Sequence, residues 1–166
     1  RQTNLGDVEV IPLLEGGQIA LRPVTSEAFA RFLNGRVRPA RYRSTQDDAL
    51  LADFEDVPLR YTDGAWSASE GSAPMVQVTF AGARDYCEAA AGRLPTLLEW
   101  LAADSTLRPP QGMTTFSEWT ADRRNAQQVV IAGRWSDETR RLTRIDISTA
   151  TQAFSSGRIG FRCFFD

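Results

Sequence analysis

The sequence predicts one α+β domain over residues 1–166, with a few short helices, short antiparallel strands and much irregular structure. Helical patterns are confined to residues 25–104, whereas strand-like stretches fill residues 116–165. The connections between them are irregular and contain Pro and Gly. Helices followed by a run of strands are typical of α+β domains, and a chain of 166 residues favours a single domain.

The first elements follow from local patterns. Residues 8–14 are expected to form a strand. The stretch TSEAFARFLNG, residues 25–35, predicts a helix because its apolar residues recur at helical spacing. Thr25 or Ser26 can cap its start and Gly35 can close its end.

The next segment predicts a strand followed by a helix. Residues 75–78 contain alternating apolar residues and are expected to form a short strand, and Thr79 is a suitable helix N-cap. Gly92 lies where a left-handed C-cap residue is expected. The predicted buried face of this helix consists of Ala83, Tyr86, Cys87 and Ala90.

The stretch AAAGRLPTLLEW, residues 89–100, predicts a sharp corner between two helices. Pro95 keeps the preceding backbone extended, so the next helix cannot start early. Thr96 and Glu99 form a capping box, in which each side chain accepts from the other residue's amide. Leu94 and Trp100 are then available to the core.

The C-terminal part predicts strands. FSEWTAD, QQVVIAGRW and RLTRIDIST have strand character, and SSGRIGFRCFF predicts a terminal turn and a strand that contains Cys163. Asp63 and Gly64 mark a turn. The tryptophans are expected in the core rather than as ligand-stacking groups; they are Trp66, Trp100, Trp119 and Trp135.

Composition excludes several classes of function. A net charge of -2 provides no electrostatic footprint for nucleic acid or an anionic membrane. The absence of His removes the Ser-His-Asp triad, the Cys-His pair and His-based metal sites. No apolar run approaches the length of a membrane span, so membrane association is expected only through parts outside this chain. Cys87 and Cys163 are either two free core thiols or one disulfide, and spacing alone leaves both open.

Several phrases in order resemble one family. PMVQVTFAGARDYCEAAAGRLPTLLEWLAA is followed by FSEWTAD, IAGRW and GRIGFRC. Together they resemble the sulfatase-modifying factor family, whose fold is that of the formylglycine-generating enzyme, a variant of the C-type lectin fold. The resemblance runs collinearly from about residue 20 to the end of the chain.

The resemblance bears on the two cysteines. Family members with Cys at these positions join them in a disulfide, which implies a bridge between Cys87 and Cys163. Such a bridge closes a loop of about 75 residues and contributes about 4 to 5 kcal/mol in the chain-entropy model. An oxidising compartment, the periplasm or the cell exterior, would follow. Two reduced core thiols remain the alternative.

The resemblance also implies that catalytic groups are missing. Catalytic members hold copper with two Cys shortly after the phrase that IAGRW resembles, and those positions fall near Asp137 and Leu142. Cu(I) needs soft thiolate ligands, which neither residue supplies. The iron-dependent relatives use His, which this chain lacks. The calcium-binding section expected between Ala103 and Ser117 is shortened. We therefore expect no catalytic residues, no metal and no cofactor.

Several carboxylates are candidates for acid–base chemistry as well as for structural roles. Paired carboxylates can serve as general acid and base, and the candidates are Glu99, Glu118, Asp122, Asp137 and Asp146. Capping by Glu99 and a structural role for the EWTAD phrase are favoured instead. Residues 135–137, WSD, resemble the calcium- and sugar-binding tripeptides of C-type lectins, but chance explains so short a match better.

The sequence hypothesis is a non-catalytic binding or regulatory module, periplasmic or extracellular, that recognises a protein partner, for example in bacterial signalling or secretion. Two Arg-rich segments, residues 34–43 and 135–144, are expected to be solvated surface, and the second is the better candidate for docking an acidic patch. The candidate partner-binding residues are Arg134, which directly precedes this segment, and Asp137, Arg140 and Arg141 within it. The alternative is a divergent oxidoreductase or maturation enzyme of the same family.

Overall fold

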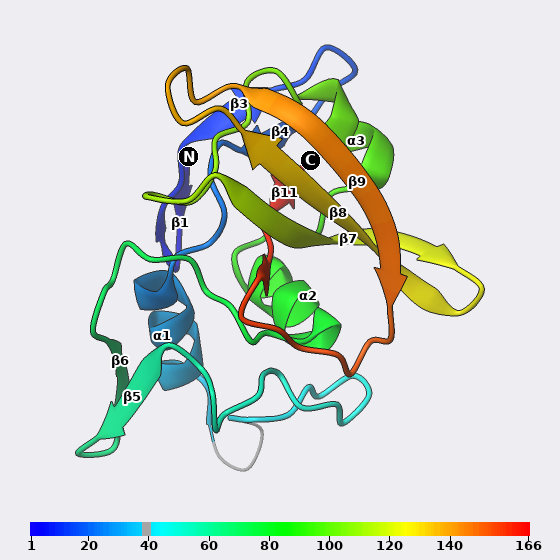
Figure 1. Cartoon of the computed structure of the whole chain (residues 1–166). Helices are drawn as coiled ribbons and strands as arrows, with labels where there is room; N and C mark the ends of the chain where they lie inside the picture. The colour runs from blue at the N-terminus through cyan, green and yellow to red at the C-terminus, as the bar shows by residue number, and fades with distance from the viewer. Residues whose placement is uncertain (38–40) are drawn as a thin grey trace.

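The computed structural model describes residues 1–37 and 41–166, and within them the chain is a mixed α+β structure (Figure 1). Part of the first Arg-rich segment, residues 38–40, lies outside the described residues. The helices are α1 (Ser26–Asn34), α2 (Phe80–Ala89) and α3 (Leu97–Ala102). The strands are β1 (Gln2–Thr3), β2 (Gly6–Asp7), β3 (Val10–Pro12), β4 (Gln18–Ala20), β5 (Leu59–Thr62), β6 (Ala65–Ala68), β7 (Thr115–Arg124), β8 (Gln127–Trp135), β9 (Leu142–Ala150), β10 (Ile159–Gly160) and β11 (Phe164–Phe165).

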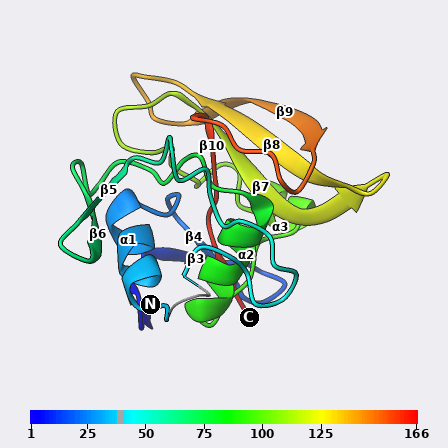
Figure 2. The same cartoon turned by 90° about the horizontal axis from the view of Figure 1, so that it is seen from below.

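The main sheet has the strand order β10-β7-β8-β9. The pairs β7–β8 and β8–β9 are antiparallel, and the short β10 runs parallel to β7. The β7–β8 turn needs two residues with positive φ, and Asn125 and Ala126 adopt φ values of 50° and 65°. Figure 2 shows α1 and α2 together on one side of this sheet. The arrangement leaves β9 at the sheet's edge.

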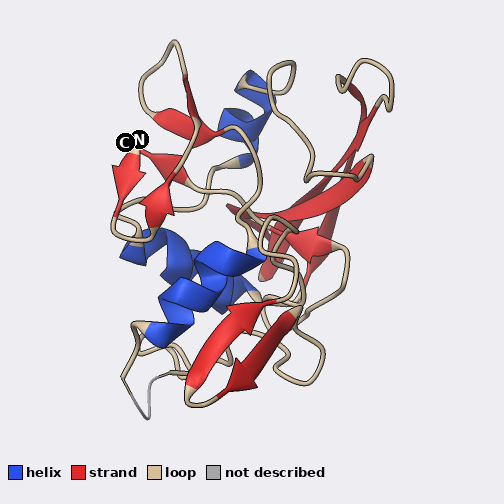
Figure 3. Cartoon of the chain, turned by 90° about the vertical axis from the view of Figure 1, so that its left-hand side faces the viewer, coloured by secondary structure: helices blue, strands red, loops and turns tan. Residues whose placement is uncertain are grey.

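Smaller sheets surround the helices (Figure 3). β4 lies between β3 and β11, so the C-terminal strand pairs with the N-terminal part of the chain. The guanidinium of Arg1 lies 4.7 Å from the ring centroid of Phe165. β5 and β6 form a hairpin whose turn residues, Asp63 and Gly64, both have positive φ, as a two-residue type I′ turn requires. The sequence prediction of a turn there is confirmed.

The core consists of two clusters. One joins α1, α2 and Trp119, and the other joins α3 to β4, β7 and β8 through Trp100 and Trp135. All the tryptophans, Trp66 included, are at most 9% exposed, so their predicted place in the core is confirmed. Three indoles donate to buried acceptors: Trp100 to Glu118, Trp119 to the carbonyl of Val78, and Trp135 to the carbonyl of Leu107.

The predicted helix starts are confirmed. Thr25 accepts a hydrogen bond from the amide of Ala28, and Thr79 accepts one from the amide of Gly82. Thr96 and Glu99 make both bonds of the capping box. Threonine at these positions satisfies amides that have no partner inside the helix.

Three other predictions are wrong. Residues 75–78 form no strand; Met75 and Val78 are fully buried in irregular backbone, where Gln77 has a φ of 59°. Cys163 lies between β10 and β11 rather than in a strand. The left-handed residue after α2 is Ala91, with a φ of 63°, and not Gly92. Burial explains the apolar pattern at 75–78, where pairing is limited to one isolated bridge between Val78 and Ala52.

Candidate functional site

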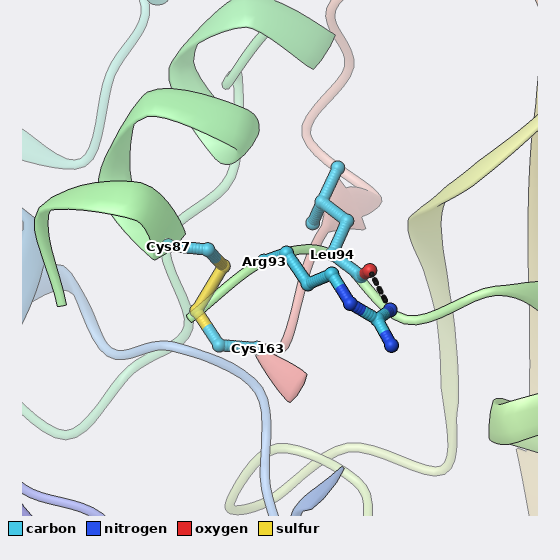
Figure 4. Close-up of a disulfide and its surroundings, with 4 residues drawn as sticks. All are labelled: Cys87, Arg93, Leu94 and Cys163. Atoms are coloured by element: carbon cyan, nitrogen blue, oxygen red, sulfur yellow. Dashed lines mark hydrogen bonds between the residues drawn. A yellow bond between two sulfur atoms is a disulfide. The ribbon is translucent and has the colours of Figure 1, made fainter. Parts of the chain in front are cut away.

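The corner between α2 and α3 is fastened to the end of the chain. Arg93 and Phe164 exchange two backbone hydrogen bonds of 2.8 and 2.7 Å. Next to them, a disulfide joins Cys87 on α2 to Cys163 (Figure 4). The bridge lies in the core, since both cysteines are at most 2% exposed. Because these are the chain's only cysteines, no free thiol remains in this form of the protein.

Arg93 is the polar centre of this corner. Its guanidinium donates to the carbonyl of Leu94 (Figure 4). It also donates to both carboxylate oxygens of Glu99 at 2.8 and 2.7 Å, and to Asp166. The bonds to Glu99 raise the pKa of Arg93 above its ordinary value. Burial acts to raise the pKa of Glu99, but the bonds from Arg93 and from the amide of Thr96 outweigh it, so that pKa lies below its usual value. Glu99 therefore serves as an ionised cap.

A second polar centre is fully buried. Arg162 and Glu118 are both 0% exposed and form a bidentate pair with N···O distances of 2.6 and 2.7 Å. The remaining N–H groups of Arg162 donate to backbone carbonyls, namely those of Ala20, Leu21 and Arg108. Glu118 also accepts from the indole of Trp100. All five guanidinium N–H groups thus have acceptors, which a buried charge requires.

Asp137 and Leu142, near which the sequence resemblance is expected to place the family's copper-binding cysteines, lie at the tip of the β8–β9 hairpin. Asp137 is in the turn, with a side chain 90% exposed. Leu142 pairs with Trp135 across the hairpin and packs against the second core cluster. Neither residue offers a thiolate, so the ligand type does not suit Cu(I). The two side chains also lie in different environments, Asp137 in solvent and Leu142 against the core.

The four predicted partner-binding residues occupy this same hairpin. Arg134 and Arg141 are exposed. Arg140 is held in place: its guanidinium donates to the carbonyl of Met113 at 3.2 Å and lies 3.7 Å from Asp137. Its backbone is also constrained, with a φ of 58°. The structure therefore brings all four together, with Arg134 and Arg141 more accessible than Arg140.

The carboxylates considered for acid–base chemistry are dispersed. Glu99 and Asp122 both accept from the start of α3, Asp122 through the amide of Leu97. Glu118 is paired with Arg162, and Asp146 with Arg144. Within residues 1–37 and 41–166, no group of three or more His, Cys, Asp or Glu residues is placed to hold a metal ion.

A cavity of about 230 Å³ lies between α1, α2 and the N-terminal strands. Its lining includes Arg22, Arg31, Tyr86 and the bridged Cys163. Burial raises the pKa of Tyr86 to about 12, although the charge of Arg31 opposes the rise. The Tyr86 ring is stacked on Phe29 at a centroid distance of 5.8 Å, so this side chain is a core residue at the cavity wall.

Sequence reasoning missed Arg162 and Arg144. Arginine is seldom fully buried, so a sequence pattern does not predict a core position for Arg162. The signal that the sequence offers is that Arg162 belongs to the phrase GFRC, which resembles a family phrase. Arg144 ends the second Arg-rich segment and pairs with Asp146 two residues on. The alternation of charged and apolar residues along β9 is visible in the sequence and could have identified it.

The fold and these sites define an α+β domain of the formylglycine-generating-enzyme type. The sequence matches the sulfatase-modifying factor enzyme 1-like domain over residues 11–109, and the chain belongs to that family. Among solved structures it is similar to the one described as "Crystal Structure of CarF". The TM-score is 0.51 at 14% identity, with 90% of this chain and 86% of that chain covered, so this likeness shows the fold alone.

Two further findings bear on the class. No significant match was found among curated proteins. No helix in the described part of the chain is long and apolar enough to cross a membrane. Family membership does not by itself assign an activity, because the same fold carries different functions.

Proposed function

We propose that this chain is a non-catalytic binding or regulatory module of the sulfatase-modifying factor family. The proposal is carried by the β8–β9 hairpin, because the sequence resemblance places the family's copper-binding cysteines near Asp137 and Leu142, and neither residue is a cysteine. Both cysteines of the chain are already used in the Cys87–Cys163 bridge. No thiolate is then left for Cu(I) at that hairpin.

The same hairpin supplies the proposed docking surface for an acidic patch on a protein partner. Arg134 and Arg141 are exposed there, and Arg140 is pre-positioned by its bonds to Met113 and Asp137. Arginine binds carboxylates in a bidentate manner, and a held guanidinium loses less conformational entropy on binding. A partner in signalling or secretion would fit a module of this type.

An extracytoplasmic location belongs to the same proposal. The support is the disulfide, because such bridges persist in the periplasm and outside the cell and are rare in reducing compartments. Labelling of the protein isolated from its native cells with a thiol reagent, before and after reduction, checks this. Labelling without reductant contradicts an oxidising location.

The activity part is tested by titrating the purified protein with Cu(I) and by offering a Cys-containing peptide under oxygen. The proposal expects neither stoichiometric copper binding nor peptide oxidation. Either result would instead establish a divergent oxidoreductase, the alternative function.

The docking part is tested by affinity capture from native extract with Arg134→Glu/Arg141→Glu as bait. A matched control is Arg60→Glu, which changes an exposed arginine on β5, outside the hairpin. A hairpin partner is lost from the double variant and retained by the control. Equal capture by both variants would refute docking at the hairpin.

A further inference from the structure

β9 is an open edge of the main sheet. It is the last strand in the order β10-β7-β8-β9, and no other strand among residues 1–37 and 41–166 pairs with its outer side. Figure 1 shows it on the outside of the molecule, beyond β8. Over its nine residues, Leu142–Ala150, it contains neither Pro nor Gly. Its outer backbone N–H and C=O groups are therefore available to another strand.

The side chains of β9 favour such pairing. β-branched residues alternate along it at Thr143, Ile145, Ile147 and Thr149, which suits strand conformation. Ile147 is 42% exposed, so apolar surface is present at the edge. Proteins commonly protect long open edges with Pro, bulges or inward-pointing charges. β9 lacks Pro and carries its charges on one exposed face; its register shift lies at its start, at Thr143, and residues 144–150 stay in regular register with β8.

The two charges of β9 have opposite signs and lie two residues apart. Arg144 is opposite Arg134 and Asp146 is opposite Ala132 in the β8–β9 register, so both point to the same face of the sheet. Their side chains are 65% and 63% exposed and form an ion pair of 3.2 Å. An exposed pair of this kind contributes little to the fold and is free to exchange partners.

From this arrangement we infer that β9 pairs antiparallel with β9 of a second copy of the chain. The two strands are related by a two-fold axis through Ile145. In this register Arg144 of each copy faces Asp146 of the other, within the regular part of the strand that begins at Arg144. The two main sheets join into one continuous sheet through a self-complementary interface.

The charges select this register over its neighbours. In an antiparallel two-fold pair, opposite residues must point to the same face of the sheet. The two-fold axis can therefore pass through any one residue of β9, and moving it by one residue gives the neighbouring register. Centring the pair on residue 144 would place Arg144 opposite itself, and centring it on 146 would do the same for Asp146. Like charges directly opposite each other destabilise a sheet. Centring on Ile145 makes two opposite-charge pairs instead.

Sedimentation equilibrium of the disulfide-bonded protein tests the inference. The wild type is expected to dimerise reversibly. Arg144→Asp places two carboxylates opposite each other, and Asp146→Arg does the same with two guanidinium groups. Each single variant is expected to weaken the dimer about 10- to 100-fold. The control Arg60→Glu, on β5, leaves dimerisation unchanged.

Mixing the two single variants is the decisive measurement. In a mixed pair, positions 144 and 146 are both acidic in one copy and both basic in the other, so every facing pair has opposite charges. An equimolar mixture is therefore expected to recover a dimer close to the wild type in affinity. High salt reduces the differences, because it screens exposed charges. Circular dichroism of each variant checks that the fold is intact.

A wild type that stays monomeric up to about 1 mM overturns the inference. So does a mixture that associates no more tightly than either variant alone, or an Arg144→Asp dimer as tight as the wild type. None of these outcomes affects the proposed docking of a partner at the hairpin, which is measured by capture.

Discussion

Arg162 and Glu118 form the one salt bridge in the described residues whose two side chains are both at most 1% exposed. The pair connects β7 to the C-terminal segment, and its backbone acceptors connect two further parts of the chain, one at Ala20 and Leu21 and one at Arg108. Burying two charges is costly, and this pair is tolerated because every guanidinium N–H has an acceptor. Its role is to fix the positions of β4, β7 and the loop at Arg108, which are not joined to one another by strand pairing.

Arg162→Met is therefore expected to lower the free energy of unfolding by about 3–5 kcal/mol, because Glu118 stays buried without its partner. Urea denaturation measures the loss. Adding Glu118→Gln to the same variant removes the stranded charge and should recover part of the stability, since the amide oxygen can still accept from Trp100. A loss below about 1 kcal/mol for the single variant would contradict this role.

At the scale of elements, the C-terminal end of α2 depends on two adjacent residues with different constraints. Ala91 has a left-handed φ of 63°, which costs about 1–2 kcal/mol for a residue with a Cβ. Gly92 has no such φ, but a Cβ there would lie 2.6 Å from the carbonyl oxygen of Phe164. The close approach of Phe164 in β11 therefore requires a glycine at position 92. The left-handed backbone, which a glycine would also favour, lies one residue earlier, at Ala91.

This predicts opposite effects for two neighbouring substitutions. Gly92→Ala is expected to destabilise the protein by about 1–3 kcal/mol, because the backbone of Phe164 must move. Ala91→Gly is expected to be neutral or to stabilise it by up to about 1 kcal/mol, because it relieves the left-handed strain. Thermal unfolding of the two variants side by side measures both. If Ala91→Gly were less stable than Gly92→Ala, the assignment of close packing to Gly92 and of left-handed strain to Ala91 would be refuted.

Local chemistry explains which elements could be predicted from the sequence. Helix caps such as Thr96 with Glu99 depend on residues within one turn, so their pattern is visible in the chain. Met75 and Val78 have the same alternation as a strand, but tertiary contacts bury them in irregular backbone, where Val78 makes only an isolated bridge with Ala52. Gly92 was assigned to the wrong role because its constraint comes from Phe164, which is 72 positions away in sequence and adjacent in space.

The candidate site was predictable to a similar extent. The hairpin residues Arg134, Asp137, Arg140 and Arg141 lie together, as their closeness in sequence implies. The fixed position of Arg140 could not be predicted, because its partner is the carbonyl of Met113 on another loop. The cysteine pairing came from the family resemblance, since spacing alone left reduced thiols open.

For the whole molecule, the disulfide between Cys87 and Cys163 spans 76 positions and joins α2 to the end of the chain. Replacing both cysteines with Ala is expected to cost about 4 kcal/mol, mainly by increasing the conformational freedom of the unfolded chain. Chemical denaturation with and without reductant measures this. Reductant should destabilise the wild type by a similar amount and leave the double variant unchanged; an unaffected wild type would contradict the prediction.

The bridge has a mechanical consequence as well. If the chain were pulled from its two ends, the stretch between Cys87 and Cys163 could not lengthen while the bond was intact, because force would pass directly through the sulfur atoms. About 260 Å of extended chain would stay hidden from the pull. A channel that passes a polypeptide as a single extended strand would meet the closed ring formed by residues 87–163, and passage would require reduction of the bridge or room for two strands side by side.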